Sequence, residues 1–233
     1  MDDALFHAQR MIEEGADILD IGGESTRPGY TRISDEEEIS RVAPVIEALK
    51  KRFDIPLSVD TYKSGVASAA IAAGADLIND IWGLKADKKM VEVIAKAKLP
   101  SCLMHNRETM DYNNFLEDVV SDLQETLNIA KKAGISKDTI ILDPGVGFAK
   151  NYEQNLAITN LLEVLDTLGC PVLLGTSRKS MIGLTLDLPS DQREEGTMVT
   201  TVWAVQKGCM FVRVHNVQAN VRAIKMAEAL LKN

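Results

Sequence analysis

The sequence lacks the patterns that mark secreted, membrane-spanning and nucleic-acid-binding proteins. No apolar run approaches the roughly 20 residues that a membrane-spanning helix needs. The first residues, MDDALFHAQRM, do not have the basic-then-apolar pattern of a secretory signal. The net charge is −8, with 34 acidic and 26 basic residues, so no basic stripe for nucleic acid is present. These absences predict a cytoplasmic protein that binds neither membranes nor nucleic acid, and in which an anionic ligand needs a local cluster of basic groups.

Cysteines and nucleotide-binding motifs are also sparse. The three cysteines, Cys102, Cys170 and Cys209, are far apart, and each lies in or beside an apolar run. We therefore expect reduced, packed thiols instead of a disulfide framework or a zinc site. The spacing GxxxxGK[ST] of a phosphate-binding P-loop is absent, and no GxGxxG follows a predicted strand, so the common nucleotide-binding loops are excluded.

What the sequence does contain is a regular alternation of short apolar runs and amphipathic segments. The runs predict strands at 16–21, 55–60, 75–80, 99–105, 139–143, 170–176 and 209–215. The amphipathic segments predict helices at 2–14, 36–51, 65–73, 88–97, 115–134, 152–168, 193–207 and 217–231. Such alternation is typical of a parallel sheet covered by helices.

The count of elements favours one particular arrangement. Seven strands with eight helices, a helix coming first, predict an α/β fold of the (β/α)8 TIM-barrel type with the first β-strand absent from the given sequence. A doubly wound open sheet is the alternative. The 233 residues fit one domain, because barrels of this kind run to such lengths undivided, and no linker or low-complexity tract divides them.

Polar residues follow nearly every predicted strand. In a parallel β/α barrel the active site lies at the carboxyl ends of the strands. The residues at these ends are Asp20 with the loop ESTRPG, Asp60, Asn79, Met104-His105, Asp143, Thr176 to Ser180, and Arg213 with His215. A single polar residue at a strand end can simply cap the next helix, but polar residues at seven successive strand ends indicate a binding site.

These residues are of two chemical kinds. Asp60, Asn79 and Asp143 are hydrogen-bond acceptors. A carboxylate can accept two parallel N–H bonds from the edge of a planar heterocycle. Cationic side chains suit phosphate or carboxylate oxygens, and here they are Arg27, Lys179, Arg213 and His215. The combination predicts a flat, N–H-rich ring with a phosphorylated tail. No Ser-His-Asp or Cys-His arrangement points to covalent catalysis.

The motifs, in their order along the chain, resemble those of the dihydropteroate synthase family of pterin-binding enzymes. They are DIGGESTRPG (20–29), SVDT (58–61), the Asn of IND (79), LMH (103–105), DPGVGF (143–148), TSRKS (176–180) and RVH (213–215). The resemblance covers the chain from Leu5 onward. It implies a transferase that joins 6-hydroxymethyl-7,8-dihydropterin diphosphate to p-aminobenzoate and releases pyrophosphate, assisted by Mg2+. It also implies a homodimer that sulfonamides inhibit.

The resemblance assigns roles to residues at the matching positions. It places the pterin against Asp60, Asn79, Met104, Asp143, Lys179 and Arg213. It places p-aminobenzoate against Thr26, Arg27, Pro28, Phe148, Lys179 and Ser180. Arg213 and His215 face the diphosphate in this assignment, and with Lys179 they are the expected catalytic residues. The loop after Asp20 then holds the second substrate.

Two departures from the family pattern set expectations of their own. Asn216 stands where the family commonly has Asp, which removes one charge beside His215. The family's first strand, and the Asn in the following loop that helps to bind magnesium, precede Met1. No metal ligand is therefore expected in this chain, and we expect the working enzyme to have about 40 further residues upstream, as a barrel of about 250 residues implies.

Two other functions remain open at this point. One is a methyltransferase of the same superfamily, acting on methyltetrahydrofolate and a corrinoid protein, which would share the pterin-binding Asp and Asn but would not need ESTRPG or the TSRKS cations. The other is a non-catalytic pterin-binding relative, which the missing first strand favours.

Overall fold

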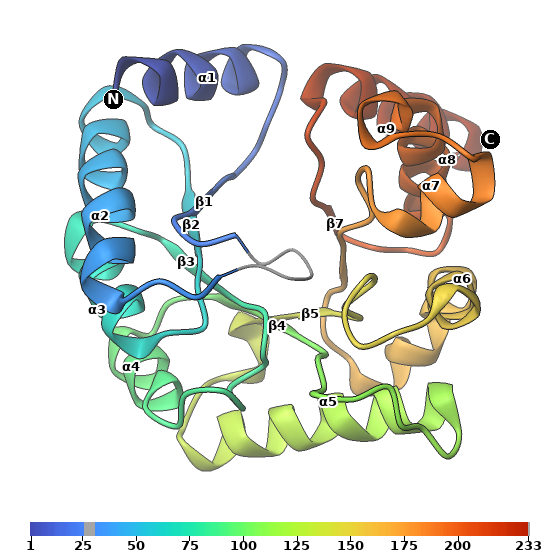
Figure 1. Ribbon diagram of the computed structural model, residues 1–233, viewed down its shortest axis with the longest axis horizontal. Coiled ribbons are helices and arrows are strands. Elements are labelled where there is room, and N and C mark those ends of the chain that lie inside the picture. Colours follow the sequence, from blue (N-terminus) through green and yellow to red (C-terminus); the bar gives the residue numbers. More distant parts are fainter. Residues whose placement is uncertain (26–30, 233) are drawn as a thin grey trace. The chain divides into compact units, whose positions relative to one another are not determined.

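The computed structural model of the chain describes residues 1–25 and 31–232. They form two compact units (Figure 1). The N-terminal unit comprises Met1–Leu103 and Thr126–Ile140, and the C-terminal unit comprises Met104–Glu125 and the chain from Ile141 onward. Each unit alternates strands with helices, as the sequence predicts.

The strands of the N-terminal unit are parallel and lie in the order of the chain. They are β1 (Leu19–Gly22), β2 (Leu57–Asp60), β3 (Leu77–Asp80) and β4 (Ser101–Met104), whose last residue begins the C-terminal unit. The register pairs Gly22 with Asp60 and Asp60 with Asn79. These polar residues thus reach the same edge of the sheet, while Val59 and Ile78 are fully buried within it.

Four α-helices lie wholly in the N-terminal unit: α1 (Asp2–Glu13), α2 (Asp35–Arg52), α3 (Ser64–Ala73) and α4 (Met90–Ala97). The start of α2 is set by Ser34, whose hydroxyl accepts a hydrogen bond from the Glu37 N–H at 3.2 Å. Four acidic residues in its first turn and three basic residues in its last complement the helix dipole. Its buried side is formed by Val42, Ile46 and Leu49, and it packs against α1 and α3.

The C-terminal unit contains the remaining strands and helices. The helix α5 (Phe115–Lys132) and the strand β5 (Ile140–Asp143) each begin in one unit and end in the other. The short strands β6 (Leu173–Leu174) and β7 (Phe211–Val212) are parallel, and an isolated parallel bridge joins Leu142 to Val172. The helices are α6 (Tyr152–Asn160), α7 (Ser180–Leu186), α8 (Glu194–Gln206) and α9 (Val217–Leu231). Among them, α8 packs on α9, and α6 packs on α7 and α8.

The predicted elements are present, with two corrections in the helices. The segment predicted as one helix at 152–168 is α6 followed by a 3₁₀ helix at Leu162–Leu168, because Leu161 leaves the helical region with φ −112° and ψ 40°. The helix α7 was not predicted at all. It has only 7 residues and begins inside the polar TSRKS motif, so it is too short to show a helical period. The strands are shorter than the apolar runs that predict them.

Two findings bear on the class of protein. No helix in the part of the chain that the structure describes is long and apolar enough to cross a membrane. All three cysteines are free thiols, with Cys102 buried and the other two half-buried.

Candidate active site

In the N-terminal unit, the predicted acceptors lie at adjacent strand ends. Asp60 is the last residue of β2, and its partner in the register is Asn79, the penultimate residue of β3. The Asn79 Nδ2 atom donates to the Asp20 Oδ2 atom of β1 at 3.4 Å. With its amide nitrogen so engaged, Asn79 presents its Oδ1 oxygen as an acceptor. The carboxylates and the amide therefore form one row of oxygen acceptors across β1, β2 and β3.

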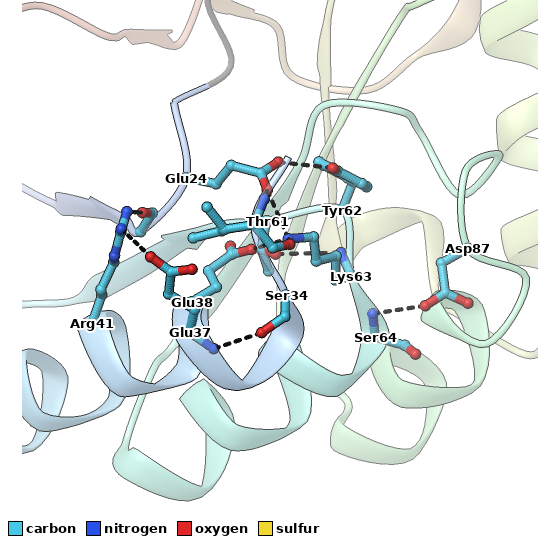
Figure 2. Close-up of polar contacts among 12 residues, drawn as sticks. Glu24, Ser34, Glu37, Glu38, Arg41, Thr61, Tyr62, Lys63, Ser64 and Asp87 are labelled. Carbon is cyan, nitrogen blue, oxygen red and sulfur yellow. Dashed lines mark hydrogen bonds and ion pairs between the residues drawn. The ribbon is translucent and has the colours of Figure 1, made fainter. Parts of the chain in front are cut away.

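A buried ionic network lies beside this row (Figure 2). The Lys63 Nζ atom contacts Glu38 Oε2 at 2.7 Å and Glu24 Oε2 at 2.8 Å. It also donates to the Ile33 carbonyl at 2.8 Å, and the Ile33 N–H donates back to Glu24 Oε2 at 2.8 Å. Tyr62 donates to the other Glu24 oxygen at 2.8 Å. Residues 24 and 33 are thus tied to each other and to the residues that follow β2.

The network favours the charged forms of Glu24 and Lys63. Burial by itself raises the pKa of Glu24, but hydrogen bonds from Lys63, Ile33 and Tyr62 and the charge of Lys63 lower it overall. Burial likewise lowers the pKa of Lys63, but its bonds to Glu24 and Glu38 raise it overall. Glu24 and Lys63 therefore stay charged at neutral pH.

Replacing Lys63 by Met is expected to destabilise the fold by about 3 kcal/mol or more, because it leaves the buried carboxyl groups of Glu24 and Glu38 without their cationic partner. The side chains of Glu24 and Glu38 are only 3% and 1% exposed. Urea unfolding measures the loss. The matched control is Lys50→Met, since Lys50 pairs with Asp76 on the surface at 2.9 Å, where such a pair contributes about 1 kcal/mol at most. Equal losses in the two variants would contradict the importance of the network.

The wild-type network should also be acid-sensitive. Glu24 has a folded-state pKa below its ordinary value of 4.5, so its contribution to stability is complete above that pH. It is lost as the pH falls through the lower folded-state value. Unfolding measured from pH 6 down to pH 3 should therefore show a steeper loss for the wild type than for Lys63→Met.

In the C-terminal unit, Asp143, Lys179 and Arg213 converge around Gly175. A Cβ atom placed on Gly175 would lie 3.7 Å from Asp143 Oδ2, 3.9 Å from Lys179 Nζ and 3.9 Å from Arg213 Cβ. Asp143 ends β5 and is 7% exposed, with its Oδ1 atom accepting from the Gly145 N–H at 2.7 Å. Burial raises the pKa of Asp143, against the opposing effects of Lys179, Gly145, Lys150 and Arg213. A buried carboxylate with two cations beside it is the chemistry that the sequence predicts.

Lys179 also organises the loop that follows β5. Its Nζ atom donates to the Val146 carbonyl and lies 4.9 Å from the centre of the Phe148 ring. The loop passes so close that a Cβ atom on Gly147, whose φ is +84°, would lie 3.2 Å from Lys179 Cδ. Lys179 and Phe148, both predicted to contact p-aminobenzoate, are therefore in contact with each other.

His215, which follows β7, is held by Ser177, a residue of the loop after β6. The Ser177 hydroxyl accepts from the His215 backbone N–H at 3.2 Å and lies 2.8 Å from the His215 Nδ1 atom. Ser177 thus holds both the backbone and the Nδ1 side of the His215 ring, which leaves Nε2 as the ring nitrogen that Ser177 does not contact. The next residue, Asn216, caps α9 by accepting from the Ala219 N–H at 3.1 Å. Asn and Asp cap a helix equally well, so the departure at 216 preserves this structural role.

The other predicted residues are placed as follows. Met104, the last residue of β4, is buried. Ser180, the first residue of α7, is exposed. Thr26, Arg27 and Pro28 lie outside the described residues. Within residues 1–25 and 31–232, no group of three or more His, Cys, Asp or Glu side chains is arranged to hold a metal ion.

Sequence reasoning missed several residues that support these groups. They are Lys63 with Glu38 in the N-terminal unit, and Lys150 with Asp122 in the C-terminal unit; His105 and Ser177 were placed at the strand ends, but without these supporting roles. One signal was present for Lys150, which ends the glycine-rich motif DPGVGFAK, yet a lysine is ordinarily read as exposed. Its burial depends on contacts with residues far away in the chain.

Comparisons with known proteins agree along the whole length. The profile of the family described as pterin binding enzyme matches residues 1–215. The chain is 58% identical to the dihydropteroate synthase of Clostridium beijerinckii, covering 100% of this chain and 87% of that protein. Among solved structures, dihydropteroate synthase from Clostridium difficile in the presence of pteroic acid matches with a TM-score of 0.97 at 45% identity, covering 100% and 89% of the two chains. The Xanthomonas albilineans enzyme with 4-aminobenzoic acid matches with a TM-score of 0.96 at 42% identity, covering 100% and 85%.

Proposed function

The chain belongs to the family of pterin binding enzymes, and we propose on that basis that it carries out the dihydropteroate synthase reaction. In this reaction 6-hydroxymethyl-7,8-dihydropterin diphosphate and p-aminobenzoate give 7,8-dihydropteroate and pyrophosphate. The fold is that of the family's α/β barrels, as the likeness to the solved synthases indicates. The observation that carries the proposal is the convergence of buried Asp143 with Lys179 and Arg213 around Gly175.

The proposed roles follow from the chemistry of the residues. Asp143 accepts hydrogen bonds from the pterin amino group and ring N–H, because a carboxylate matches that edge with two oxygens. The family resemblance assigns Asp60 and Asn79 as further acceptors for the pterin, and Met104 as an apolar contact for the ring. Lys179 serves both substrates in this assignment, at the pterin carbonyl and near p-aminobenzoate.

The bond changes need charge stabilisation more than they need a nucleophile from the protein. The bond between the pterin methylene carbon and the diphosphate oxygen breaks, and its electron pair leaves with pyrophosphate. The electron-rich pterin stabilises the cationic methylene, the aryl amine attacks it, and the amine releases a proton to solvent. Arg213 and His215 are the groups proposed to stabilise the departing diphosphate. The free aryl amine is already nucleophilic, so positioning replaces strong base catalysis.

Further features of the family are proposed for this chain as well. Mg2+ would bind with the diphosphate, since this ion prefers phosphate oxygens together with one or two protein ligands. A homodimer and a cytoplasmic location are proposed from the family resemblance and from the free cysteines.

A turnover assay tests the proposal. The purified chain is supplied with the pterin diphosphate, p-aminobenzoate and Mg2+, and dihydropteroate and pyrophosphate are measured together. We expect both products in equal amounts and neither when p-aminobenzoate is omitted. A parallel reaction with methyltetrahydrofolate and a corrinoid protein tests the methyltransferase alternative, which the names of the matched relatives do not favour. Pterin binding without either reaction would indicate a non-catalytic relative.

Replacing Ser180 by Ala is expected to raise the KM for p-aminobenzoate about tenfold, because a hydrogen bond to a charged group contributes about 1.5 kcal/mol or more. Ser180 is exposed, so the fold should keep its stability. Affinity for the pterin, measured by calorimetry with 6-hydroxymethylpterin, should stay unchanged, while a sulfonamide should inhibit less well. If pterin affinity falls in step with the KM change, Ser180 supports the surrounding structure and is not a contact for the second substrate.

A further inference from the structure

The loop between β5 and α6 has its backbone carbonyls bound by side chains, from Lys150 at the end of the loop and from Lys179 and Tyr112 outside it. Lys150 Nζ donates to the carbonyls of Gly145 and Phe148, each at 3.0 Å. Lys179 Nζ donates to the carbonyl of Val146. Tyr112 donates to the carbonyl of Ala149 at 2.9 Å. Four carbonyls of the loop are thus bound by side chains, in addition to the turn in which the Phe148 N–H donates to the Gly145 carbonyl at 3.0 Å.

Lys150 is the most buried of these donors. It is only 7% exposed, and besides the two carbonyls its Nζ atom contacts the Nδ1 atom of His105 at 2.8 Å. An ammonium group has three N–H donors, and here it meets three acceptors. A neutral amine, with two N–H groups and a lone pair, could not donate to all three. The hydrogen-bond geometry therefore suits the charged form of Lys150.

His105 accepts from Lys150 because Asp122 sets its tautomer. The His105 Nε2 atom lies 3.0 Å from Asp122 Oδ2, which also accepts from Arg107 Nε at 2.6 Å. Although burial raises the pKa of Asp122, its bonds to His105 and Arg107 lower it overall, so it is a carboxylate. Burial lowers the pKa of His105 to about 4, so the ring is neutral. Its single proton points at Asp122, and Nδ1 is left as the acceptor for Lys150.

The backbone places the loop directly on His105. Gly145 has φ +71°, and a Cβ atom there would lie 2.0 Å from the His105 carbonyl oxygen, a clash with backbone that only glycine avoids. The His105 N–H donates to the Asp143 carbonyl at 2.8 Å, which joins the ends of β4 and β5. Asp122, His105 and Lys150 thus form a chain of contacts from α5 to the loop.

We propose that Lys150, held by the Asp122–His105 pair, is a positioning residue for the second substrate. By binding the Gly145 and Phe148 carbonyls it fixes residues 145–149, and with them the Phe148 ring and the Val146 carbonyl that receives Lys179. The identity of that substrate, p-aminobenzoate, rests on the proposed function, whereas the ordering of the loop does not. Asp143 is held separately by β5 and the His105 N–H, so the pterin contact depends less on Lys150.

The first test replaces Lys150 by Met, which keeps the length of the side chain and removes its donors. Hydrogen–deuterium exchange of the substrate-free protein should become at least tenfold faster at residues 145–149 and stay unchanged in α8 and α9. In kinetics, the KM for p-aminobenzoate should rise at least tenfold, while the affinity for 6-hydroxymethylpterin falls less than threefold. Lys207→Met is the matched control, because Lys207 pairs with Glu163 at 2.8 Å outside this loop, and it should change none of these values.

The second test asks whether Lys150 acts through the contact chain. Asp122→Asn keeps the shape of the side chain but no longer enforces the His105 tautomer, so it should raise the same KM by a smaller factor. The double variant Asp122→Asn with Lys150→Met should be no worse than Lys150→Met alone, because residues that act as one unit are not additive. If the double variant raised the KM by the product of the two single factors, Asp122 and Lys150 would not be coupled.

The pH profile gives an independent reading. Burial lowers the pKa of Lys150 to about 7, the charges of Lys179 and Arg107 lower it as well, and those of Asp143 and Asp122 raise it. As the pH rises through about 7, Lys150 loses the proton that completes its third hydrogen bond, so the wild-type KM for p-aminobenzoate should increase. Lys150→Met should lack this rise.

Three results would overturn the proposal: unchanged exchange at residues 145–149, equally faster exchange throughout the unit, or equal losses of affinity for pterin and p-aminobenzoate. Absence of dihydropteroate formation by the wild type is a different outcome. It would remove the proposed function, while the exchange data would still decide whether Lys150 orders the loop.

Discussion

Replacing Arg213 by Ala is expected to lower kcat by about 100-fold to 1,000-fold, the loss typical when one group that stabilises developing negative charge is removed. The position of Arg213 is well defined, since its backbone N–H donates to the Leu174 carbonyl at 3.1 Å directly after β7. Its side chain starts beside the same glycine as Lys179 and Asp143. Under the proposed function, this position puts a cationic side chain near the charge that leaves with pyrophosphate.

The affinity of two ligands separates this role from a structural one. Arg213→Ala should weaken binding of the pterin diphosphate much more than binding of 6-hydroxymethylpterin, which has no diphosphate. Lys179→Ala should lower turnover by a similar factor but act on both ligands, because Lys179 is proposed to contact the pterin itself. Arg213→Lys retains the charge without the planar fork and should recover part of the activity. If Arg213→Ala costs both ligands the same affinity, the diphosphate role is wrong.

Replacing Asp143 by Asn is expected to weaken pterin binding by about 10-fold to 100-fold, corresponding to about 1–3 kcal/mol for imperfectly paired buried groups. The amide keeps one oxygen for the Gly145 N–H, but its nitrogen is a donor where the pterin also presents donors. Stability should not fall with affinity, since burial raises the pKa of Asp143 and a neutral side chain is easier to bury. Calorimetry with 6-hydroxymethylpterin and thermal unfolding measure the two effects.

The wild type offers a check on the same residue without mutation. Because the pKa of Asp143 is raised above its ordinary value of 3.8, protonation begins at a higher pH than for an exposed aspartate. Pterin binding should therefore weaken as the pH falls, and Asp143→Asn should lose that dependence. An unchanged dissociation constant in the variant would remove Asp143 from the pterin contacts.

The repeating architecture and the polar strand ends were readable from the sequence, for a physical reason. Strands buried on both faces must be apolar throughout, and parallel strands require helical crossovers. The alternation of apolar strands and amphipathic helices is therefore visible in short stretches of the sequence. Asp60, Asn79 and Asp143 were found because a polar residue that ends an apolar run marks the edge of the sheet. The helix α7 and the break at Leu161 were missed because a few residues carry too little periodicity to separate them from a loop or from a continuous helix.

Local sequence patterns are enough to predict the α/β class, the order of the strands and helices, and the chemical kinds of group at the strand ends, since all of these depend on a few neighbouring residues. Which of these groups are buried and paired depends on tertiary packing. Lys150 and His105 are 45 residues apart, and Lys63 and Glu38 are 25 residues apart, yet both pairs form at less than 3 Å. A buried charge is tolerated only where its partners surround it, and those partners are brought together by the packing of distant strands and helices, which no local pattern records.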